Sequence, residues 1–297
     1  MSVSRDGISW DILNGGECIL QSHIGERGVR DPFCIRRRGG GYYIIATNLS
    51  IYNRIQALKN KNEVWKNSRN RFPDNPTPGN GEIIVWESDD LIHWSEARSI
   101  AVAPEGAGSA WAPKAIYDKS KEMYMVVWAS TIPDDDYAVL RLYRAYTSDF
   151  ASFTEPELWL DRSDNGYNAL DAVIAEDNGS FYRIYKSDKI RIETAESLDG
   201  EWESVNGNIA KLAVKHEGAA IYKNNISGEW ELLLDCLNKE VFGYERFVTD
   251  DMGGGVFRRE HMNVPEGIIY RHGSVMPITE REYKALRKWD EKNKRRI

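Results

Sequence analysis

A phrase that returns along the chain is the sequence feature that most restricts the fold. Each copy begins with a small or acidic residue, continues through an apolar strand and a Gly- or charge-rich turn, and ends in a second strand rich in Tyr and Trp. The copies begin at Asp31, Ala112, Asp171 and Glu217, with a truncated copy at His272. Their starts are separated by 81, 59, 46 and 55 residues. Self-similarity at such a period is typical of repeat architectures.

A second phrase follows each of the first four copies. It is a strand, a Ser- or Asp-containing turn and an aromatic residue, with shared positions at Ser88, Ser148, Ser197 and Asp250. Each unit therefore holds about four short strands, which is the pattern of a propeller blade. Five starts predict an all-β, five-bladed β-propeller, with residues 1–297 forming a single domain.

The segments outside the repeat have their own predictions. The polar stretch from about Arg54 to Gly81 lengthens the first interval and predicts a long inserted loop. The segment Ile8–Leu13 is predicted to complete the last blade and close the ring. One short C-terminal helix is predicted near Glu280 to Lys292, because Thr279 and Glu282 have the spacing of a capping box.

Composition narrows the function classes. The chain has 297 residues, of which 41% are hydrophobic and 29% charged, with a formal net charge of −7. Its apolar runs are far shorter than the ~20 residues of a membrane helix. An acidic chain without a basic stripe is a poor nucleic-acid ligand. The chain has 10 Trp, 15 Tyr and 8 Phe, and exposed Trp and Tyr rings commonly bind sugars. We therefore expect neither a membrane nor a nucleic-acid partner.

The cysteines and the N-terminus bear on the compartment. Cys18, Cys34 and Cys236 lie far apart and have no zinc-ligand spacing. Free thiols suit a reducing compartment. The first residues lack the apolar core of a signal peptide, so the expected location is cytoplasmic.

The carboxylates at the repeat starts are the main functional signal. Asp31, Asp171 and Glu217 occupy one repeat position in blades one, three and four, so we expect them to converge at the central channel. A structural alternative is that they cap turns or bind a cation. Glycosidic hydrolysis needs one protonated carboxyl and one ionised carboxylate, and a neighbouring carboxylate raises the pKa of the acid. This pattern favours a glycosidase.

The chain resembles glycoside hydrolase family 43 from about Gly28 to Thr279. The resemblance rests on the order and spacing of six short pieces, which are Arg30-Asp-Pro-Phe33, Ser88-Asp-Asp-Leu-Ile-His-Trp94, Trp111-Ala-Pro113, Leu170-Asp-Ala-Val173, His216-Glu-Gly218 and Arg271-His-Gly273. Ala172 and Ala219 stand where the family often has Pro. These departures remove no carboxylate and affect the expected backbone only.

The resemblance implies a five-bladed propeller and an inverting mechanism. By residue, it implies that Asp31 is the general base, Asp171 the group that modulates the pKa of the acid, and Glu217 the general acid. It also implies that His272 lies near the channel centre, linked through water to a calcium ion. We expect no cofactor in the chemistry itself, with calcium as a structural ion of the channel.

The finer resemblance concerns the sugar. The Arg30-Asp-Pro opening, the phrase Val102–Gly108 and the Arg271-His-Gly ending resemble a branch that contains α-L-arabinofuranosidases. Related members act on β-xylosides or galactofuranosides. The expected activity is release of terminal α-L-arabinofuranosyl residues from plant cell-wall oligo- or polysaccharides, with an arabinose- or xylose-containing oligosaccharide as the partner.

Five further residues are candidates for sugar binding, and each also has a structural interpretation. They are Trp111, Arg271, Arg30, Asn168 and Lys186. Trp111 is equally suited to stacking on a sugar or to packing, and the two arginines to sugar hydroxyls or to pairing with Asp31 or Asp171. His216 is expected to be packed rather than catalytic, since strand neighbours point to opposite faces.

Two other readings of the sequence stay open. A retaining, fructosidase-like propeller also carries an Arg-Asp-Pro triplet, but its nucleophile precedes the triplet in an Asn-Asp-Pro-type motif that is missing here. A non-catalytic, glycan-binding propeller would keep the aromatic residues but would not need three acids in the channel.

Overall fold

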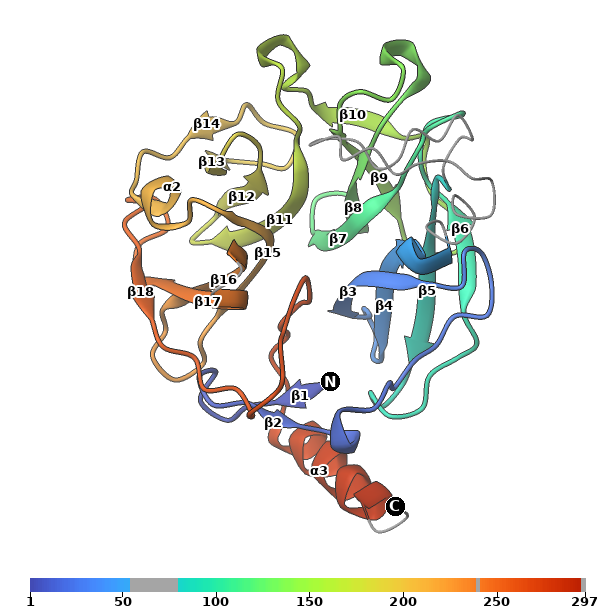
Figure 1. Cartoon of the computed structure of the whole chain (residues 1–297), viewed down its shortest axis with the longest axis vertical. Coiled ribbons are helices and arrows are strands. Elements are labelled where there is room, and N and C mark those ends of the chain that lie inside the picture. The colour runs from blue at the N-terminus through green and yellow to red at the C-terminus, as the bar shows by residue number, and fades with distance from the viewer. Residues whose placement is uncertain (54–79, 239–240, 295–297) are drawn as a thin grey trace.

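The computed structural model describes residues 1–53, 80–238 and 241–294. The loop predicted from about Arg54 to Gly81 lies almost entirely outside the described residues. Within them, four antiparallel sheets of four strands surround a common centre (Figure 1). In every sheet the strands follow one another in sequence order from the centre outward. The predicted propeller is confirmed, with four complete blades.

The blades have the bounds that follow. The first consists of β3 (Val29–Arg36), β4 (Tyr42–Asn48), β5 (Glu82–Ser88) and β6 (Arg98–Ala101). The second consists of β7 (Trp111–Asp118), β8 (Met123–Ser130), β9 (Arg141–Thr147) and β10 (Glu157–Leu160). The third consists of β11 (Leu170–Asp177), β12 (Ser180–Lys186), β13 (Ile190–Ala195) and β14 (Glu203–Ser204). The fourth consists of β15 (His216–Lys223), β16 (Trp230–Asn238), β17 (Val241–Thr249) and β18 (Arg258–Glu260).

The core lies between neighbouring blades. Every residue of β4 is buried, and so is all of β8 after Met123. These strands read as continuous apolar runs because both faces of a blade pack on a neighbour. Trp128 of the second blade, for example, joins a cluster with Ile45 and Val85 of the first. Burying each such side chain contributes roughly 1.5–3 kcal/mol.

The four innermost strands share one irregularity. In each, the pairing with the second strand shifts by a β-bulge directly after Arg30, Trp111, Leu170 or Glu217. The following residue has a left-handed backbone, with φ of 53° at Asp31, 48° at Ala112, 54° at Asp171 and 61° at Gly218. Bulges re-aim side chains next to active sites, and these bulges lie on the innermost strand of each blade.

The bulges correct one detail of the repeat. Asp31 and Asp171 are equivalent, as predicted, but Glu217 is equivalent to Arg30, one position earlier. Gly218 takes the left-handed position in the fourth blade. The sequence repeat was aligned on its acidic residues. In the structure, the equivalent residues of the four blades are those with positive φ. The longer glutamate side chain approaches the centre from the preceding position.

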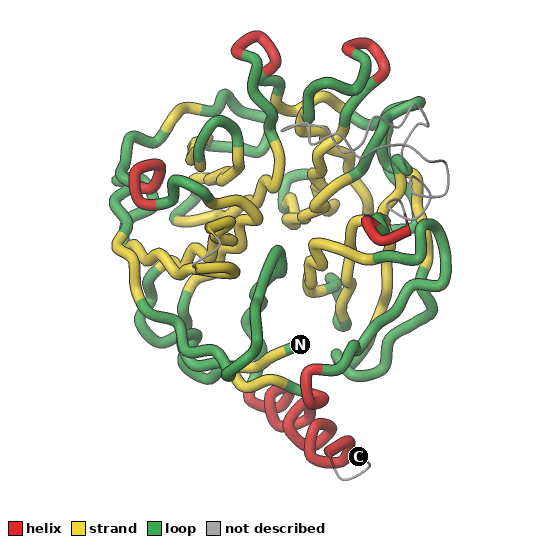
Figure 2. Tube along the Cα trace, in the orientation of Figure 1, coloured by secondary structure: helices red, strands yellow, loops and turns green. Residues whose placement is uncertain are grey.

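The fifth sector differs most from the prediction. His272 lies outside any strand, with φ of 38°, so the expected fifth initial strand near it is wrong. Figure 2 shows that the segment after β18 reaches the centre as a loop. The sector also holds a two-stranded sheet of β1 (Ser2–Val3) and β2 (Asp11–Ile12). Pro277 has no N–H for a ladder, and the repeat is truncated here.

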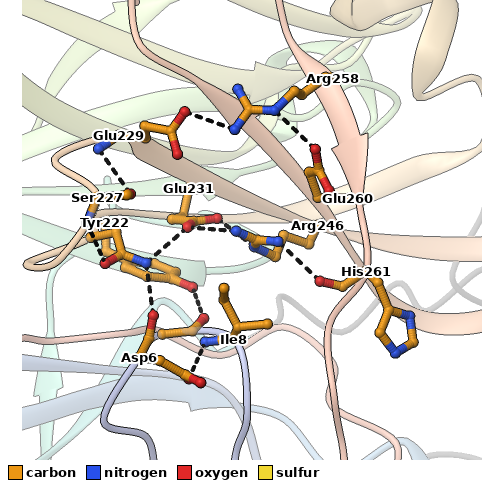
Figure 3. A network of polar contacts seen from close by, with 12 residues as sticks. Asp6, Ile8, Tyr222, Ser227, Glu229, Glu231, Arg246, Arg258, Glu260 and His261 are labelled. Atoms are coloured by element: carbon orange, nitrogen blue, oxygen red, sulfur yellow. Dashed lines mark hydrogen bonds and ion pairs between the residues drawn. The ribbon is translucent and has the colours of Figure 1, made fainter.

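The N-terminal segment closes the ring as predicted, mainly through single contacts. Ser9 forms a parallel bridge with Asn263, and the backbone of residues 8 and 10 bonds to Asn263. The Tyr222 hydroxyl donates to the Gly7 carbonyl at 2.8 Å. Beside this contact, Arg246 pairs with the fully buried Glu231 at 2.6 Å (Figure 3). The N-terminal segment is thus fixed to the fourth blade and to Asn263, which follows that blade.

The predicted C-terminal helix is confirmed as α3 (Glu280–Lys294). Thr279 Oγ1 accepts the Glu282 N–H at 3.3 Å, and a Glu282 carboxylate oxygen accepts the Thr279 N–H at 2.6 Å, which completes the capping box. Leu286 of α3 is buried against the N-terminal segment. None of the short helical turns in the described ranges was anticipated from the sequence. They are η1 (Asn14–Gly16), η2 (Pro133–Asp135), η3 (Ser163–Asn165) and α2 (Ile209–Leu212). No helix among the described residues is long and apolar enough to cross a membrane.

Candidate active site

His272 joins the predicted carboxylates at the channel centre. Its Nδ1 lies 3.0 Å from an Asp31 carboxylate oxygen, and its Nε2 lies 3.1 Å from a Glu217 carboxylate oxygen. Ligand atoms of Asp171, Glu217 and His272 lie within 4.8 Å of one another. The structure therefore brings together all four residues that the sequence placed at the centre.

Asp31 is held from two sides. Its Oδ2 accepts the Thr47 hydroxyl at 2.7 Å, and Thr47 Oγ1 in turn accepts the Ala112 N–H at 2.7 Å. Burial raises the pKa of Asp31, but hydrogen bonds from His272 and Thr47 and the positive charges of His272 and Lys114 outweigh it. The net effect is a pKa below the usual value, so Asp31 is ionised at neutral pH.

Asp171 has the opposite balance. Burial raises its pKa to about 6, and the charges of Glu217 and Asp31 act in the same direction. The charge of His272 and the hydrogen bond from the Gly218 N–H, at 2.9 Å, oppose this shift. Because Gly218 follows Glu217 directly, Asp171 is tied to the backbone that carries Glu217.

Glu217 is the most accessible of the three acids that the sequence singled out. Its side chain is 25% exposed, whereas that of Asp31 is 9% exposed and Asp171 is buried. A general acid must come within hydrogen-bond reach of the leaving-group oxygen of a bound substrate, which is easier for a more exposed side chain. Glu217 meets this requirement better than the two aspartates.

His272 carries the positive charge at the centre. Burial lowers its pKa, but hydrogen bonds to Asp235, Asp31 and Glu217 and the charge of Asp171 raise it to about 11. The ring is an imidazolium at neutral pH, so both nitrogens donate. Opposed charges inside a poorly hydrated site are stabilised when they are paired and hydrogen-bonded.

Asp235 is a member of the site that sequence reasoning missed. It is fully buried on β16 and pairs with Glu217 in the sheet register. Its Oδ2 accepts hydrogen bonds from His272 at 3.0 Å and from Arg271 at 2.7 and 2.8 Å. Burial raises the pKa of Asp235, and the bonds from these two cations more than reverse the shift. In the sequence, Asp235 could have been noticed as an acidic residue inside the otherwise apolar run of β16.

Two further residues support the centre and were also missed. The buried Lys114 donates to the Gly273 carbonyl at 3.2 Å; burial lowers its pKa, against the opposing charges of Asp31 and Asp171. The Tyr244 hydroxyl accepts the Gly273 N–H at 2.6 Å and lies 3.1 Å from the Gly218 carbonyl. Lys114 and Tyr244 thus hold the backbone that follows His272 and Glu217.

The predicted sugar-binding residues have different surroundings. Arg271 lies at the site, where it pairs with Asp235 rather than with Asp31 or Asp171, and its guanidinium stacks 4.3 Å from the Phe242 ring centre. Arg30 and Trp111 are the last paired residues before the bulge in their blades, which is the position of Glu217 in the fourth blade. Lys186 pairs with Leu170 across β11 and β12, the same register position that Asp235 has opposite Glu217. The side-chain amide oxygen (Oδ1) of Asn168 accepts the Leu140 N–H at 2.8 Å. Contact of these residues with a sugar stays a prediction.

The residues at the centre offer few ligands for the predicted calcium ion. Calcium takes six to eight oxygen ligands. The cluster of Asp171, Glu217 and His272 supplies carboxylate oxygens from two residues. Both His272 nitrogens already face carboxylates at 3.0–3.1 Å, so this arrangement leaves neither nitrogen for a calcium-bound water. The chemistry below uses no calcium ion; dialysis against a chelator followed by an activity assay tests the prediction.

Comparison with known proteins adds the family. A family model described as a probable glycosyl hydrolase domain, related to family 43, matches residues 1–284. An α-L-arabinofuranosidase of Bifidobacterium longum subsp. longum is 28% identical over 206 residues, which are 62% of this chain. The chain covers only 17% of that protein's length.

Two solved structures share the fold. A thermostable family-43 glycoside hydrolase superposes with a TM-score of 0.59 at 18% identity, covering 86% of this chain and 82% of the other. The catalytic domain of a family-62 α-L-arabinofuranosidase from Coprinopsis cinerea superposes with a TM-score of 0.56 at 13% identity, covering 85% and 74%. With the family model matching it nearly from end to end, this propeller belongs to the glycosyl hydrolase 43-related family.

Proposed function

We propose that the chain is an inverting glycosidase that releases terminal α-L-arabinofuranosyl residues. The observation that carries the mechanism is the placement of Asp31 and Glu217 on opposite nitrogens of His272. An imidazole ring and two hydrogen bonds separate these carboxylates. Inverting enzymes keep their two carboxyl groups apart to leave room for a water molecule, whereas retaining enzymes hold them closer.

The roles follow from charge and access. Asp31, ionised and fixed by Thr47 and His272, accepts a proton from the water that attacks the anomeric carbon. Glu217, the more accessible carboxyl, donates its proton to the glycosidic oxygen as that bond breaks. Asp171 places a like charge beside Glu217 and is proposed to modulate the acid. At the end of the cycle Asp31 holds the proton and Glu217 is ionised, and exchange with solvent restores both.

The sugar is inferred from the resemblance of the sequence and from the relative's name. The Bifidobacterium longum protein is named an α-L-arabinofuranosidase, and the sequence phrases at Arg30, Val102–Gly108 and Arg271 point to the same branch. The substrate would be an arabinose-containing oligosaccharide. Hydrolysis of β-xylosides or galactofuranosides instead would keep the mechanism and change the specificity.

The test is a panel of nitrophenyl glycosides with the anomer of the product followed by NMR. The panel contains the α-L-arabinofuranoside, the β-D-xyloside and the β-D-galactofuranoside. Asp31→Asn should lower kcat by about a thousandfold, within the usual range for loss of a general base. Asp164→Asn, at an exposed turn, is the matched control and should keep full activity.

Each outcome decides one part of the proposal. A product with retained configuration would overturn the inverting mechanism. More than about a tenth of wild-type activity in Asp31→Asn would reject its role as base. Binding of arabino-oligosaccharides without hydrolysis of any panel member would leave a glycan-binding propeller.

A further inference from the structure

A second cluster of ligand-type side chains lies behind the acid Glu217. It consists of His216 on β15, Cys236 on β16 and Glu245 on β17, and we call it the β15–β17 cluster. His216 and Cys236 are paired across the two strands. Since successive strand residues point to opposite faces, this pair lies on the face away from Glu217 and Asp235. The proposed glycosidase chemistry uses none of the three residues.

The geometry of the β15–β17 cluster is that of a binding site. Its histidine nitrogen, thiol sulfur and carboxylate oxygen lie within 4.8 Å of one another. His216 Nε2 lies 2.6 Å from a Glu245 carboxylate oxygen. His216 and Cys236 are only 3% and 5% exposed, and the Glu245 side chain is 15% exposed. Glu245 therefore gives the buried pair a route to solvent.

The cluster also has unused binding capacity. Cys236 is a free thiol. His216 Nδ1 is buried and has no hydrogen-bond partner in the part of the chain that the structure describes. A buried polar atom without a partner costs about 1–3 kcal/mol. His216 Nε2 and a Glu245 carboxylate oxygen are already in contact, so two of the three ligand groups of the cluster are adjacent before an ion binds.

We propose that the β15–β17 cluster binds one borderline-soft divalent transition metal ion, of which Zn²⁺ is the best match. Nitrogen, sulfur and oxygen ligands from His, Cys and Glu are the set that zinc takes, with a water in the fourth tetrahedral position. A thiol disfavours calcium and magnesium, which prefer oxygen ligands. On binding, Cys236 loses its thiol proton to solvent and ligates as the thiolate. The ion would tie β15, β16 and β17 together directly behind Glu217.

Arg259 is the residue that competes with the ion. Its guanidinium lies 3.2 Å from the second Glu245 oxygen. The Arg259 side chain is 49% exposed, so it can move into solvent when a cation takes its place. Replacing this arginine with a neutral side chain should therefore strengthen metal binding, an effect not expected of a purely structural cluster.

Titration of the metal-free protein with Co²⁺ tests the proposal, because a cobalt–thiolate bond gives a charge-transfer absorption band that oxygen and nitrogen ligands do not. The band should grow to one ion per chain and disappear when Zn²⁺ is added. It should be absent in Cys236→Ser and unchanged in Cys34→Ser, the matched thiol control. The channel cluster contains no sulfur, so metal bound there would not give the band.

Two more variants keep the proposal testable if Cys236→Ser folds poorly. Glu245→Gln should weaken Co²⁺ binding by about tenfold or more, and Arg259→Gln should tighten it. No charge-transfer band in the wild-type protein, or a band that persists in Cys236→Ser, would overturn the proposal. Equal affinity in the wild type, Glu245→Gln and Arg259→Gln would also overturn it.

Discussion

The chemistry of single residues at the channel depends on how four carboxylates share one imidazolium. His272 contacts Asp31, Glu217 and Asp235 at 3.0–3.1 Å, and Asp171 lies in the same cluster. Arg271 and Lys114 add positive charge. Each carboxyl therefore has a different environment, which is how similar side chains take different roles in one site.

Glu217→Gln should affect substrates according to their leaving groups. A nitrophenolate leaves with little protonation, whereas a sugar alkoxide needs the proton that Glu217 supplies. We expect a loss of about a thousandfold on arabino-oligosaccharides and a much smaller loss on nitrophenyl arabinofuranoside. The measurement is kcat/KM for both substrates. Equal losses on both would mean that Glu217 positions the sugar without donating a proton.

Asp171→Asn should move the alkaline limb of the pH–rate profile to lower pH. The pKa of Asp171 is about 6, so above that pH Asp171 places a negative charge beside the proposed acid. Asparagine removes this charge, and if Asp171 modulates the acid as proposed, the activity should fall off at a lower pH than in the wild type. The profile of kcat/KM over pH measures the shift, with Asp164→Asn as control. An unmoved alkaline limb would exclude the proposed role.

Asp171→Asn should also affect the free energy of unfolding, in a way that depends on pH. The pKa of Asp171 is raised in the folded state, so the folded protein binds this proton more tightly than the unfolded chain does. Ionised Asp171 therefore lowers the stability of the folded state. This destabilisation is absent below the pKa in the unfolded chain, about 4, and complete above the folded pKa of about 6. Asp171→Asn should thus not destabilise the fold at pH 8, and denaturant melts at pH 4 and 8 check that lost activity is not lost folding.

Several residues of the site could be predicted from sequence, and others could not. Asp31, Asp171, Glu217 and His272 begin copies of a repeat, and repeat starts in a propeller converge. Asp235 lies in a second strand, where no repeat position marks it. Only its charge within an apolar run distinguished it, and sequence alone does not tell which cation such an acid meets.

Strand bulges explain, at the scale of elements, why the predicted repeat is misaligned by one residue in the fourth blade. The positive φ at Asp31, Ala112 and Asp171 costs roughly 1 kcal/mol each for a residue with a side chain. In the fourth blade Gly218 takes this conformation at no such cost. A glycine directly after the acid was a usable signal for the shift.

Thr279→Ala should weaken the attachment of α3. It removes the hydroxyl that accepts the Glu282 N–H, and loss of such an N-cap costs about 1 kcal/mol. The free energy of unfolding, from a denaturant melt, measures the loss. Glu291→Ala, at an exposed position of the same helix, should change it by less than half as much. A cost no larger than that of the control would mean that the capping box does not stabilise the protein.

The whole molecule is a ring whose blades pack on one another and whose last sector is held by individual contacts. Repeat spacing predicts the ring, because equal units of four strands have few other ways to bury both faces. It could not predict how the ring closes. That closure depends on a few side chains, such as Tyr222 and Asn224, that reach the N-terminal segment.

Tyr222→Phe should destabilise the closed ring. It leaves the Gly7 carbonyl without the hydroxyl that donates to it at 2.8 Å, at a cost of about 1 kcal/mol. Tyr137→Phe is the matched control, because its hydroxyl also donates to a glycine carbonyl but in an exposed loop. A thermal melt compares the two. Equal shifts for both variants would mean that the contact at Gly7 adds nothing to closure.

The loop that brings Arg271 and His272 to the centre has a consequence for how such a protein can diversify. Asp31, Asp171 and Glu217 sit in paired strands, where an insertion would break a ladder of hydrogen bonds. Residues 264–279 form no strand, so changes away from the bonds that Tyr270, Gly273 and Ser274 make to the blades would break no strand pairing. A library that varies this loop while keeping Arg271 and His272 would therefore be the economical route to a new sugar preference on an unaltered catalytic ring.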